Sequence, residues 1–311
     1  MTKPSSLSWC ALIALGLIWG AAFMFAKLAL SDFGPKTLTA LRLVIGAVLL
    51  LVIAYASGNP LPDPRKPENH KLWIFIIGMG VMTNVLPFNL LNWGQQYVTS
   101  SFAGISMAVV PLLVLPLAHF LVPGEHLTPR RIIGFVIGFI GTVILVGPET
   151  FFSSTGDSLE PMGRLACVAT ACCYAIGSII TRLAPTTSMI AFSAGGLAVA
   201  AVLAVPFAIA FEGVPPLASF TSWSAAVYLG LMATGAATLM LVWTIQTAGP
   251  TFMSLVNYQV PVWAVILGTV ILGETLPVQF VAALALIMLG LLVSQKGLAT
   301  KLRALRPLWS N

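Results

Sequence analysis

The chain has 311 residues, of which 58% are hydrophobic and only 8% are charged. A water-soluble domain carries about a quarter charged residues because its surface has to be solvated, so most of this chain must face lipid. The excess of 15 Lys and Arg over 9 Asp and Glu forms no basic stripe interleaved with aromatic residues, which argues against nucleic-acid binding. The four cysteines lack metal-ligand spacing, so no metal site is expected.

Ten apolar stretches are long enough to cross a bilayer, which takes about 20 residues. They lie at about 9–29, 37–57, 72–92, 97–121, 130–147, 163–182, 188–211, 223–244, 250–272 and 278–296. The first stretch is too long for the apolar part of a cleavable signal and is expected to be a span. The sequence therefore predicts an all-α polytopic membrane protein with ten transmembrane helices.

A motif pattern occurs twice, about 150 residues apart. The matching pairs are Gly124-Glu125-x-Leu127 with Gly273-Glu274-x-Leu276, Trp93-x-x-Gln96 with Trp243-x-x-Gln246, and Pro111 with Pro261. Each copy holds five spans, and an odd number makes the second copy enter the membrane from the opposite side. We expect one repeat at 9–147, a linker at 148–162, an inverted repeat at 163–296 and a basic tail at 297–311. Inverted halves are typical of secondary transporters that work by alternating access.

The Lys and Arg residues are unequally divided between the two sides of the predicted bundle. With ten spans both termini share a side, and eleven basic residues fall there. The other side has Lys27, Lys36, Arg42 and Arg164. Since basic loops stay in the cytoplasm, both termini are predicted to be cytoplasmic.

The doubled Gly-Glu motif, the glycines that follow it and the mid-helix prolines Pro111 and Pro261 resemble the drug/metabolite transporter superfamily, in its ten-span EamA-type branch. These glycines are Gly134, Gly138, Gly141 and Gly290. Within that superfamily the pattern looks like the YddG-type exporters of amino acids. The resemblance implies two inverted five-helix halves and a central cavity lined by the first, third, fourth, sixth, eighth and ninth spans. It also implies export of aromatic and other neutral amino acids across the inner membrane.

Polar and aromatic residues within the spans are candidates for the cavity wall. Asn84 aligns with Thr234 in the other half, and a buried amide must be hydrogen-bonded, either to a substrate or to a neighbouring helix. Trp19 and Phe23 lie one turn apart on one face of their helix. Their counterparts are Tyr174 and Ser178. An aromatic wall suits an aromatic or aliphatic substrate side chain, and packing or lipid contact is the alternative.

The span at 250–272 carries Asn257 and Tyr258 where the other half has Met107 and Ala108. A feature that only one half carries is not required by the repeat, so we expect Asn257 and Tyr258 to select the substrate. Hydrogen bonding between helices is the alternative.

Pro111 and Pro261 each remove a backbone donor from a helix. Each is expected to act as a hinge that exposes polar backbone to the cavity, with a static kink as the alternative.

Several polar residues at span ends have structural interpretations. Glu125 and Glu274 are expected to cap the helices that begin after them rather than to be catalytic. Lys27 is expected to reach the membrane interface, with pairing to Asp32 or another acid as the alternative. Asn92 and Gln95, near a helix end, are expected to be solvated.

Absent motifs limit the mechanism. The sequence has no nucleotide-binding loop and no hydrolase signature, so we expect no cofactor and no enzymatic activity. No carboxylate lies in the middle of a span, which favours facilitated transport and leaves proton antiport open. The expected partners are lipid and a small neutral or zwitterionic substrate, with amino acids first, and we expect a monomer. Another neutral metabolite or drug, or a channel function, remains an alternative.

Overall fold

The computed structural model describes residues 5–122, 128–146, 159–215, 217–248 and 256–294. These residues form ten helical segments, of which seven have the length and apolarity of membrane spans and two are shorter apolar helices. In the first half they are α1 (Ser6–Ala29), α2 (Pro35–Ala56), α3 (Pro67–Gly80) continued by η1 (Val81–Val85) and α4 (Leu86–Gly94), α5 (Ser100–Ser106) continued by η2 (Met107–Val109) and α6 (Val110–Leu121), and α7 (Pro129–Val146). In the second half they are α9 (Glu160–Leu183), α10 (Met189–Glu212), α11 (Phe220–Tyr228) continued by η3 (Leu229–Ala236) and α12 (Ala237–Ala248), α14 (Val256–Val270) and α15 (Val278–Ser294).

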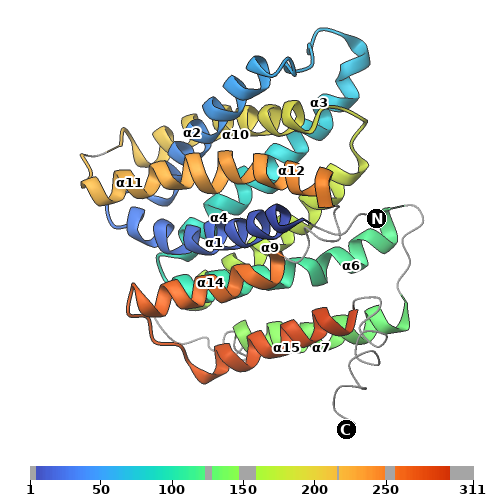
Figure 1. Ribbon diagram of the computed structural model, residues 1–311. Helices are drawn as coiled ribbons and strands as arrows, with labels where there is room; N and C mark the ends of the chain where they lie inside the picture. Colours follow the sequence, from blue (N-terminus) through green and yellow to red (C-terminus); the bar gives the residue numbers. More distant parts are fainter. Residues whose placement is uncertain (1–4, 123–127, 147–158, 216, 249–255, 295–311) are drawn as a thin grey trace.

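The ten segments alternate in direction and lie side by side (Figure 1). The protein is an all-helical, polytopic membrane protein built from two inverted five-helix halves. The helices of the two halves are intermixed, since α2 packs on α10, α1 on α14 and α7 on α15. We call the side that carries the loops at 30–34, 95–99, 213–219 and 271–277 the Asp32 face. The opposite side, with the loops at 57–66 and 184–188, is called the Pro185 face.

Glycines, which have no side chain, allow close contacts between helix backbones. A Cβ atom added to Gly290 of α15 would lie 2.5 Å from the carbonyl oxygen of Gly134 and 2.6 Å from the backbone nitrogen of Gly138, both in α7. In a membrane, small residues let helix backbones approach and gain dispersion energy that larger side chains would prevent. The Gly134-x-x-x-Gly138 pair is therefore used within the chain, where it joins the last helix of each half.

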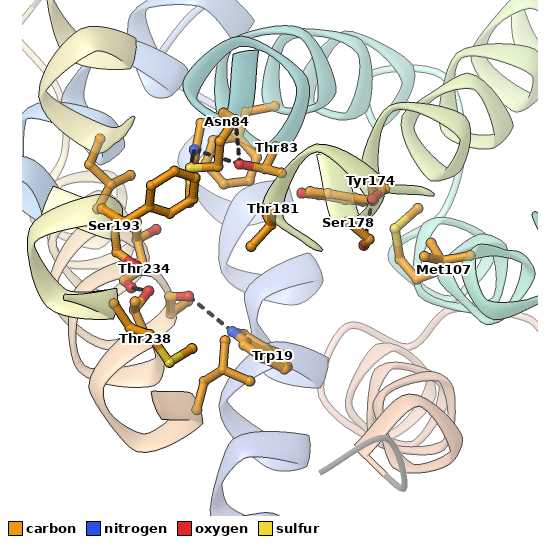
Figure 2. Close-up of a pocket in the computed structure, with 18 of the residues that line it drawn as sticks. Trp19, Thr83, Asn84, Met107, Tyr174, Ser178, Thr181, Ser193, Thr234 and Thr238 are labelled. Carbon is orange, nitrogen blue, oxygen red and sulfur yellow. Dashed lines mark hydrogen bonds between the residues drawn. The ribbon is translucent and has the colours of Figure 1, made fainter. Parts of the chain in front are cut away.

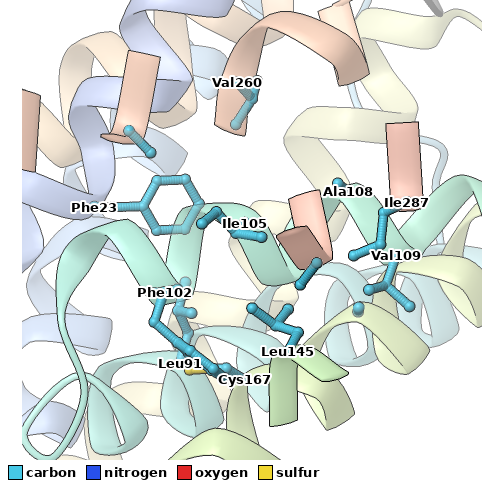
Figure 3. Packing of buried hydrophobic residues seen from close by; sticks show 14 of the residues in the cluster. Phe23, Leu91, Phe102, Ile105, Ala108, Val109, Leu145, Cys167, Val260 and Ile287 are labelled. Carbon is cyan, nitrogen blue, oxygen red and sulfur yellow. The ribbon is translucent and has the colours of Figure 1, made fainter. Parts of the chain in front are cut away.

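The largest apolar core is formed by buried side chains of both halves and is drawn in Figure 3. It combines Phe23 of α1, Phe102 and Ile105 of α5, Val260 of α14 and Ile287 of α15. Phe102 and Phe280 meet edge-on with ring centroids 5.2 Å apart, a favourable geometry for aromatic rings. Both halves contribute, so the core holds them against each other on one side of the cavity described next.

Candidate substrate-binding cavity

A cavity of about 970 Å³ lies between the two halves. Figure 2 shows the side chains around it. Of the described residues that line it, some come from every span except α7 and α15. The expectation of six lining spans was therefore too narrow, because α2 contributes Arg42 and α10 contributes four residues. These four are Met189, Phe192, Ser193 and Leu197.

The cavity reaches the Pro185 face. The loop that joins α9 to α10 lines it with Ala184, Pro185, Thr186 and Thr187, and Thr186 is exposed to solvent. The lining therefore extends from the middle of the bundle to one surface, which gives a small molecule a way in from that side.

The expected aromatic residues line this cavity. Trp19 and Phe23 lie on α1, and Tyr174 lies on α9 with Ser178 one turn further on. Trp19 Nε1 donates a hydrogen bond to the carbonyl of Ala233 at 3.1 Å, which fixes the indole against the other half (Figure 2). The Ser178 hydroxyl donates to the Tyr174 carbonyl at 2.8 Å, so part of its polarity is satisfied within its own helix.

Asn84 and Thr234, the aligned polar pair, both line the cavity. Each lies in a π-helical segment, Asn84 in η1 and Thr234 in η3. π-Helical turns are uncommon and are frequent at functional sites, and here they recur at matching positions of the two halves. Asn84 Nδ2 donates to the hydroxyl of Thr83 at 2.9 Å, and the Thr234 hydroxyl donates to the Leu229 carbonyl at 2.9 Å. Neither of these two bonds reaches another helix.

The remaining predicted residues are the two prolines and the polar pair Asn257 and Tyr258 of α14. Asn257 lines the cavity, whereas the side chain of Tyr258 lies outside what the structure describes. Pro261 lies inside α14, next to the cavity-lining Val260. Pro111 is the second residue of α6 and follows the 3₁₀ turn η2. Their hinge role stays a prediction.

Several residues that line the cavity were not predicted from the sequence. Arg42 was placed near the start of its span and was not assigned to the cavity, but it lies within α2, lines the cavity and is only 7% exposed. Arg42 is the only described lining residue that carries a full charge, and no described lining residue is acidic. The hydroxyls of Thr83, Thr181, Ser193 and Thr238 also line the cavity. Their signal was present as polar residues in apolar helices, but such residues equally serve helix packing.

At the Asp32 face, carboxylates of one half cap helices of the other. Glu274 accepts hydrogen bonds from the backbone nitrogens of Ser100 and Ser101 at 2.7 and 2.9 Å, and from the Ser101 hydroxyl at 2.6 Å. The expected capping role is confirmed, but the expected helix is wrong, because Glu274 caps α5 in the first half rather than α15. Glu125 lies outside the described residues.

Two further carboxylates repeat this arrangement. Asp32 accepts from the backbone nitrogen and hydroxyl of Ser219, at 2.8 and 2.6 Å, at the start of α11. Glu212 at the end of α10 accepts from the backbone nitrogens of Lys36 and Thr37, at 3.1 and 2.8 Å, at the start of α2. A negative charge at a helix N-terminus meets unpaired N–H groups and the positive end of the dipole. Three cross-half caps therefore hold the Asp32 face together.

Hydrogen bonds keep two of these carboxylates ionised. Bonds from Ser219 and Ser222 lower the pKa of Asp32. Burial acts to raise the pKa of Glu274, but the bonds from Ser101 and Ser100 outweigh it and the pKa is lowered. Both groups are therefore charged at neutral pH.

Basic and amide groups at the same face also bridge elements. Lys27 Nζ donates to the carbonyls of Gln95 and Val98, at 2.6 and 3.1 Å, and within the described residues it forms no ion pair with Asp32 or another acid. Asn92 and Gln95 are 1% and 0% exposed, which corrects the expectation that they are solvated. The Gln95 amide donates to the carbonyl of Phe23 at 2.9 Å, and that of Asn92 to the hydroxyl of Thr39 at 2.9 Å. These bonds give partners to two amide nitrogens that would be costly to bury alone, whereas Gln95 Oε1 has no partner among the described residues.

A membrane-embedded bundle of two inverted halves around a cavity that reaches one face has the architecture of a secondary transporter. The sequence model of the EamA-like transporter family matches residues 7–147 and again residues 161–295. The chain therefore belongs to the EamA-like transporter family, within the drug/metabolite transporter superfamily.

Similar proteins support this assignment. The aromatic amino acid exporter YddG of Ancylobacter novellus is 30% identical over 282 residues, 88% of this chain and 91% of that protein. The uncharacterized transporter YoaV of Bacillus subtilis is 25% identical over 91% of this chain and 94% of its own length. The uncharacterized inner membrane transporter YedA of Escherichia coli is 27% identical over 86% of this chain and 83% of its own length. A solved crystal structure with 25% sequence identity superposes with a TM-score of 0.64, covering 94% of this chain and 98% of the other.

Proposed function

We propose that this protein carries amino acids, aromatic and other neutral ones, out of the cell across the inner membrane. It would act as a monomer by alternating access and without ATP. The observation that carries this proposal is the central cavity. It combines an aromatic wall at Trp19, Phe23 and Tyr174 with amides and hydroxyls, and it reaches only the Pro185 face among the described residues.

The size and polarity of the cavity suit such a substrate. Small-molecule sites enclose about 300–1,000 Å³, and 970 Å³ is ample for the largest amino acid side chains. Aromatic walls bind apolar side chains, while a few polar groups hold the polar end. The export direction and the aromatic preference come from the relative in Ancylobacter novellus, which is named as an exporter of aromatic amino acids.

The two faces of the bundle support the alternating-access part of the proposal. With the termini in the cytoplasm, the Pro185 face is cytoplasmic and the cavity is open inward. The caps formed by Asp32, Glu212 and Glu274 then close the outer side. In the outward-open state these cross-half bonds would be broken and the inner side closed.

A counterflow assay tests the proposal. Purified full-length protein is reconstituted in liposomes loaded with one unlabelled amino acid, and uptake of each labelled amino acid is followed with and without a pH gradient. We expect saturable counterflow for phenylalanine, tryptophan and other neutral amino acids, at the same rate in both conditions. Absence of counterflow for every amino acid would refute the substrate class, flux linear in concentration would indicate a channel, and a dependence on the gradient would indicate proton antiport.

A further inference from the structure

A buried arginine in the cavity wall has no counter-ion among the residues that the structure describes. Arg42 lies seven residues into α2, is 7% exposed and lines the cavity. A guanidinium stays protonated in proteins, and a charge within a membrane bundle is costly unless it is paired or serves a function. Lys36 and Arg164 have the carboxylates of Glu212 and Glu160 as partners. No carboxylate in the described ranges lies within ion-pair distance of Arg42.

The protein orients this guanidinium without neutralising it. Arg42 Nε donates to the Thr234 hydroxyl at 2.8 Å, and the guanidinium carbon lies 3.9 Å from the centroid of the Phe88 ring. The first contact fixes the direction of the side chain, and the second offers a favourable cation–π surface. The two terminal nitrogens of Arg42 donate no hydrogen bond to any described residue. Those nitrogens are also not among the described buried polar atoms that lack a partner, so they keep some accessible surface, and Arg42 is a lining residue of the cavity.

We infer that Arg42 binds the carboxylate of the transported solute. Two N–H groups of a guanidinium match the two oxygens of a carboxylate, and such charge-assisted bonds are about twice as strong as neutral ones. The inference rests on the proposed transport through this cavity and narrows its substrate class. The preferred solutes carry one carboxylate and an apolar or aromatic side chain, and the corresponding amines and amides are poor substrates.

The other residues of the cavity wall determine which net charge on the solute the cavity can bind. Because Arg42 is the single cation among the described lining residues, a second carboxylate on the solute would lose its water without gaining a partner. A substrate ammonium has neutral acceptors, such as the amide oxygens of Asn84 and Asn257, rather than a carboxylate. The cavity therefore favours monocarboxylates and zwitterions over dicarboxylates and phosphorylated solutes.

Direct binding measurements test this inference. Purified full-length protein in nanodiscs is titrated by calorimetry with L-phenylalanine, its amide, phenethylamine and 3-phenylpropionate. For Arg42→Gln we expect L-phenylalanine and 3-phenylpropionate to bind about 10- to 100-fold more weakly, while phenethylamine and the amide change less than about threefold. Arg42→Lys keeps the charge but loses the two-pronged geometry, so an intermediate loss is expected. Arg65→Gln, in the exposed 57–66 loop, is the matched control and should bind like the wild type.

Two results would overturn the inference. One is that wild-type protein binds the amide as tightly as L-phenylalanine. The other is that Arg42→Gln and Arg42→Lys weaken all four probes equally and lower the melting temperature, which would make Arg42 a structural link to Thr234. Should Arg42→Gln fail to fold, Thr234→Val, which leaves the arginine without its orienting hydroxyl, is expected to give the same selective loss for carboxylates. Binding of 3-phenylpropionate that depends on Arg42, without binding or transport of any amino acid, would support the arginine site and refute the proposed amino-acid substrate.

Discussion

Removing the charge of Glu274 is expected to loosen the Asp32 face. The carboxylate accepts three hydrogen bonds at the start of α5, whereas the amide in Glu274→Gln has one acceptor oxygen and turns an N–H group toward the same donors. Loss of a helix cap costs about 1 kcal/mol. Loss of the charge at the helix end adds about 0.3–1 kcal/mol, at the lower end because Glu274 is only partly buried. The sum of about 1–2 kcal/mol corresponds to a 5- to 30-fold shift in an equilibrium.

Accessibility of a cavity residue measures this shift. Ala26 lines the cavity near the end of α1, so Ala26→Cys in a variant without the four native cysteines reports on opening at the Asp32 face. In intact cells a membrane-impermeant maleimide should label Ala26→Cys about 5- to 30-fold faster when Glu274→Gln is also present. Leu217→Cys, fully exposed at the same face, confirms which side the reagent reaches. Glu68→Gln, an exposed acid at the Pro185 face, is the matched charge control.

The pH dependence of the labelling follows from the lowered pKa of Glu274. A carboxylate whose pKa is lowered in the closed state stabilises that state fully above its ordinary pKa of 4.5, and the stabilisation is lost as the pH falls through the lowered value. The labelling rate of Ala26→Cys relative to that of the exposed Leu217→Cys, a ratio that cancels the loss of thiolate at lower pH, should therefore be constant from pH 8 to about pH 5.5 and rise only in more acidic medium. Equal labelling of the Glu274→Gln and parent proteins at neutral pH would refute the view that the cross-half cap holds this face closed.

Three further substitutions separate packing, binding and hinge roles. Gly290→Ala should lower the free energy of unfolding by about 1–3 kcal/mol, because its Cβ meets the backbone of α7; Gly78→Ala, whose Cβ would be 3.5 Å from the nearest atoms, is the control, and equal melting temperatures would contradict the close contact. Asn257→Ala should raise the KM for counterflow about fivefold with a normal melting temperature, and an unchanged KM would remove Asn257 from the site. Pro261→Ala should slow exchange while the Kd stays constant; a fall in melting temperature alone would favour a static kink.

The sequence predicted the spans and their inversion because both depend on properties that the chain shows locally. A stretch of about twenty apolar residues commonly crosses a bilayer as an α-helix. Five spans per repeat invert the second copy, independently of the side chains. The π-helical segments η1 and η3 were not predictable in this way. They depend on how α3 and α11 fit against their neighbours, and polar residues such as Asn84 and Thr234 occur in ordinary helices as well.

The sequence indicates which type of contact a residue makes, but not which residue of the other half it contacts. The Gly-Glu motif indicated a capping carboxylate, and the nearest helix in sequence was α15. The helix that Glu274 caps, α5, begins 174 residues earlier, and only the packing of the two halves brings Ser100 within reach. Asn92 and Gln95 were misjudged because the groups that bond them are also distant in sequence, although they lie in the same half, on α2 and α1.

Arg42 shows how asymmetry between the halves could be used further. The rule that unmatched residues select the substrate was applied to Asn257 but not to Arg42, because Arg42 lies near the start of its predicted span. At 1.5 Å per residue, seven residues from Pro35 place it about 10 Å along α2. The repeat-related helix α10 contains neither Lys nor Arg. A charge that the repeat does not require, and that has no acidic partner among the described residues, is better explained by the solute than by the fold.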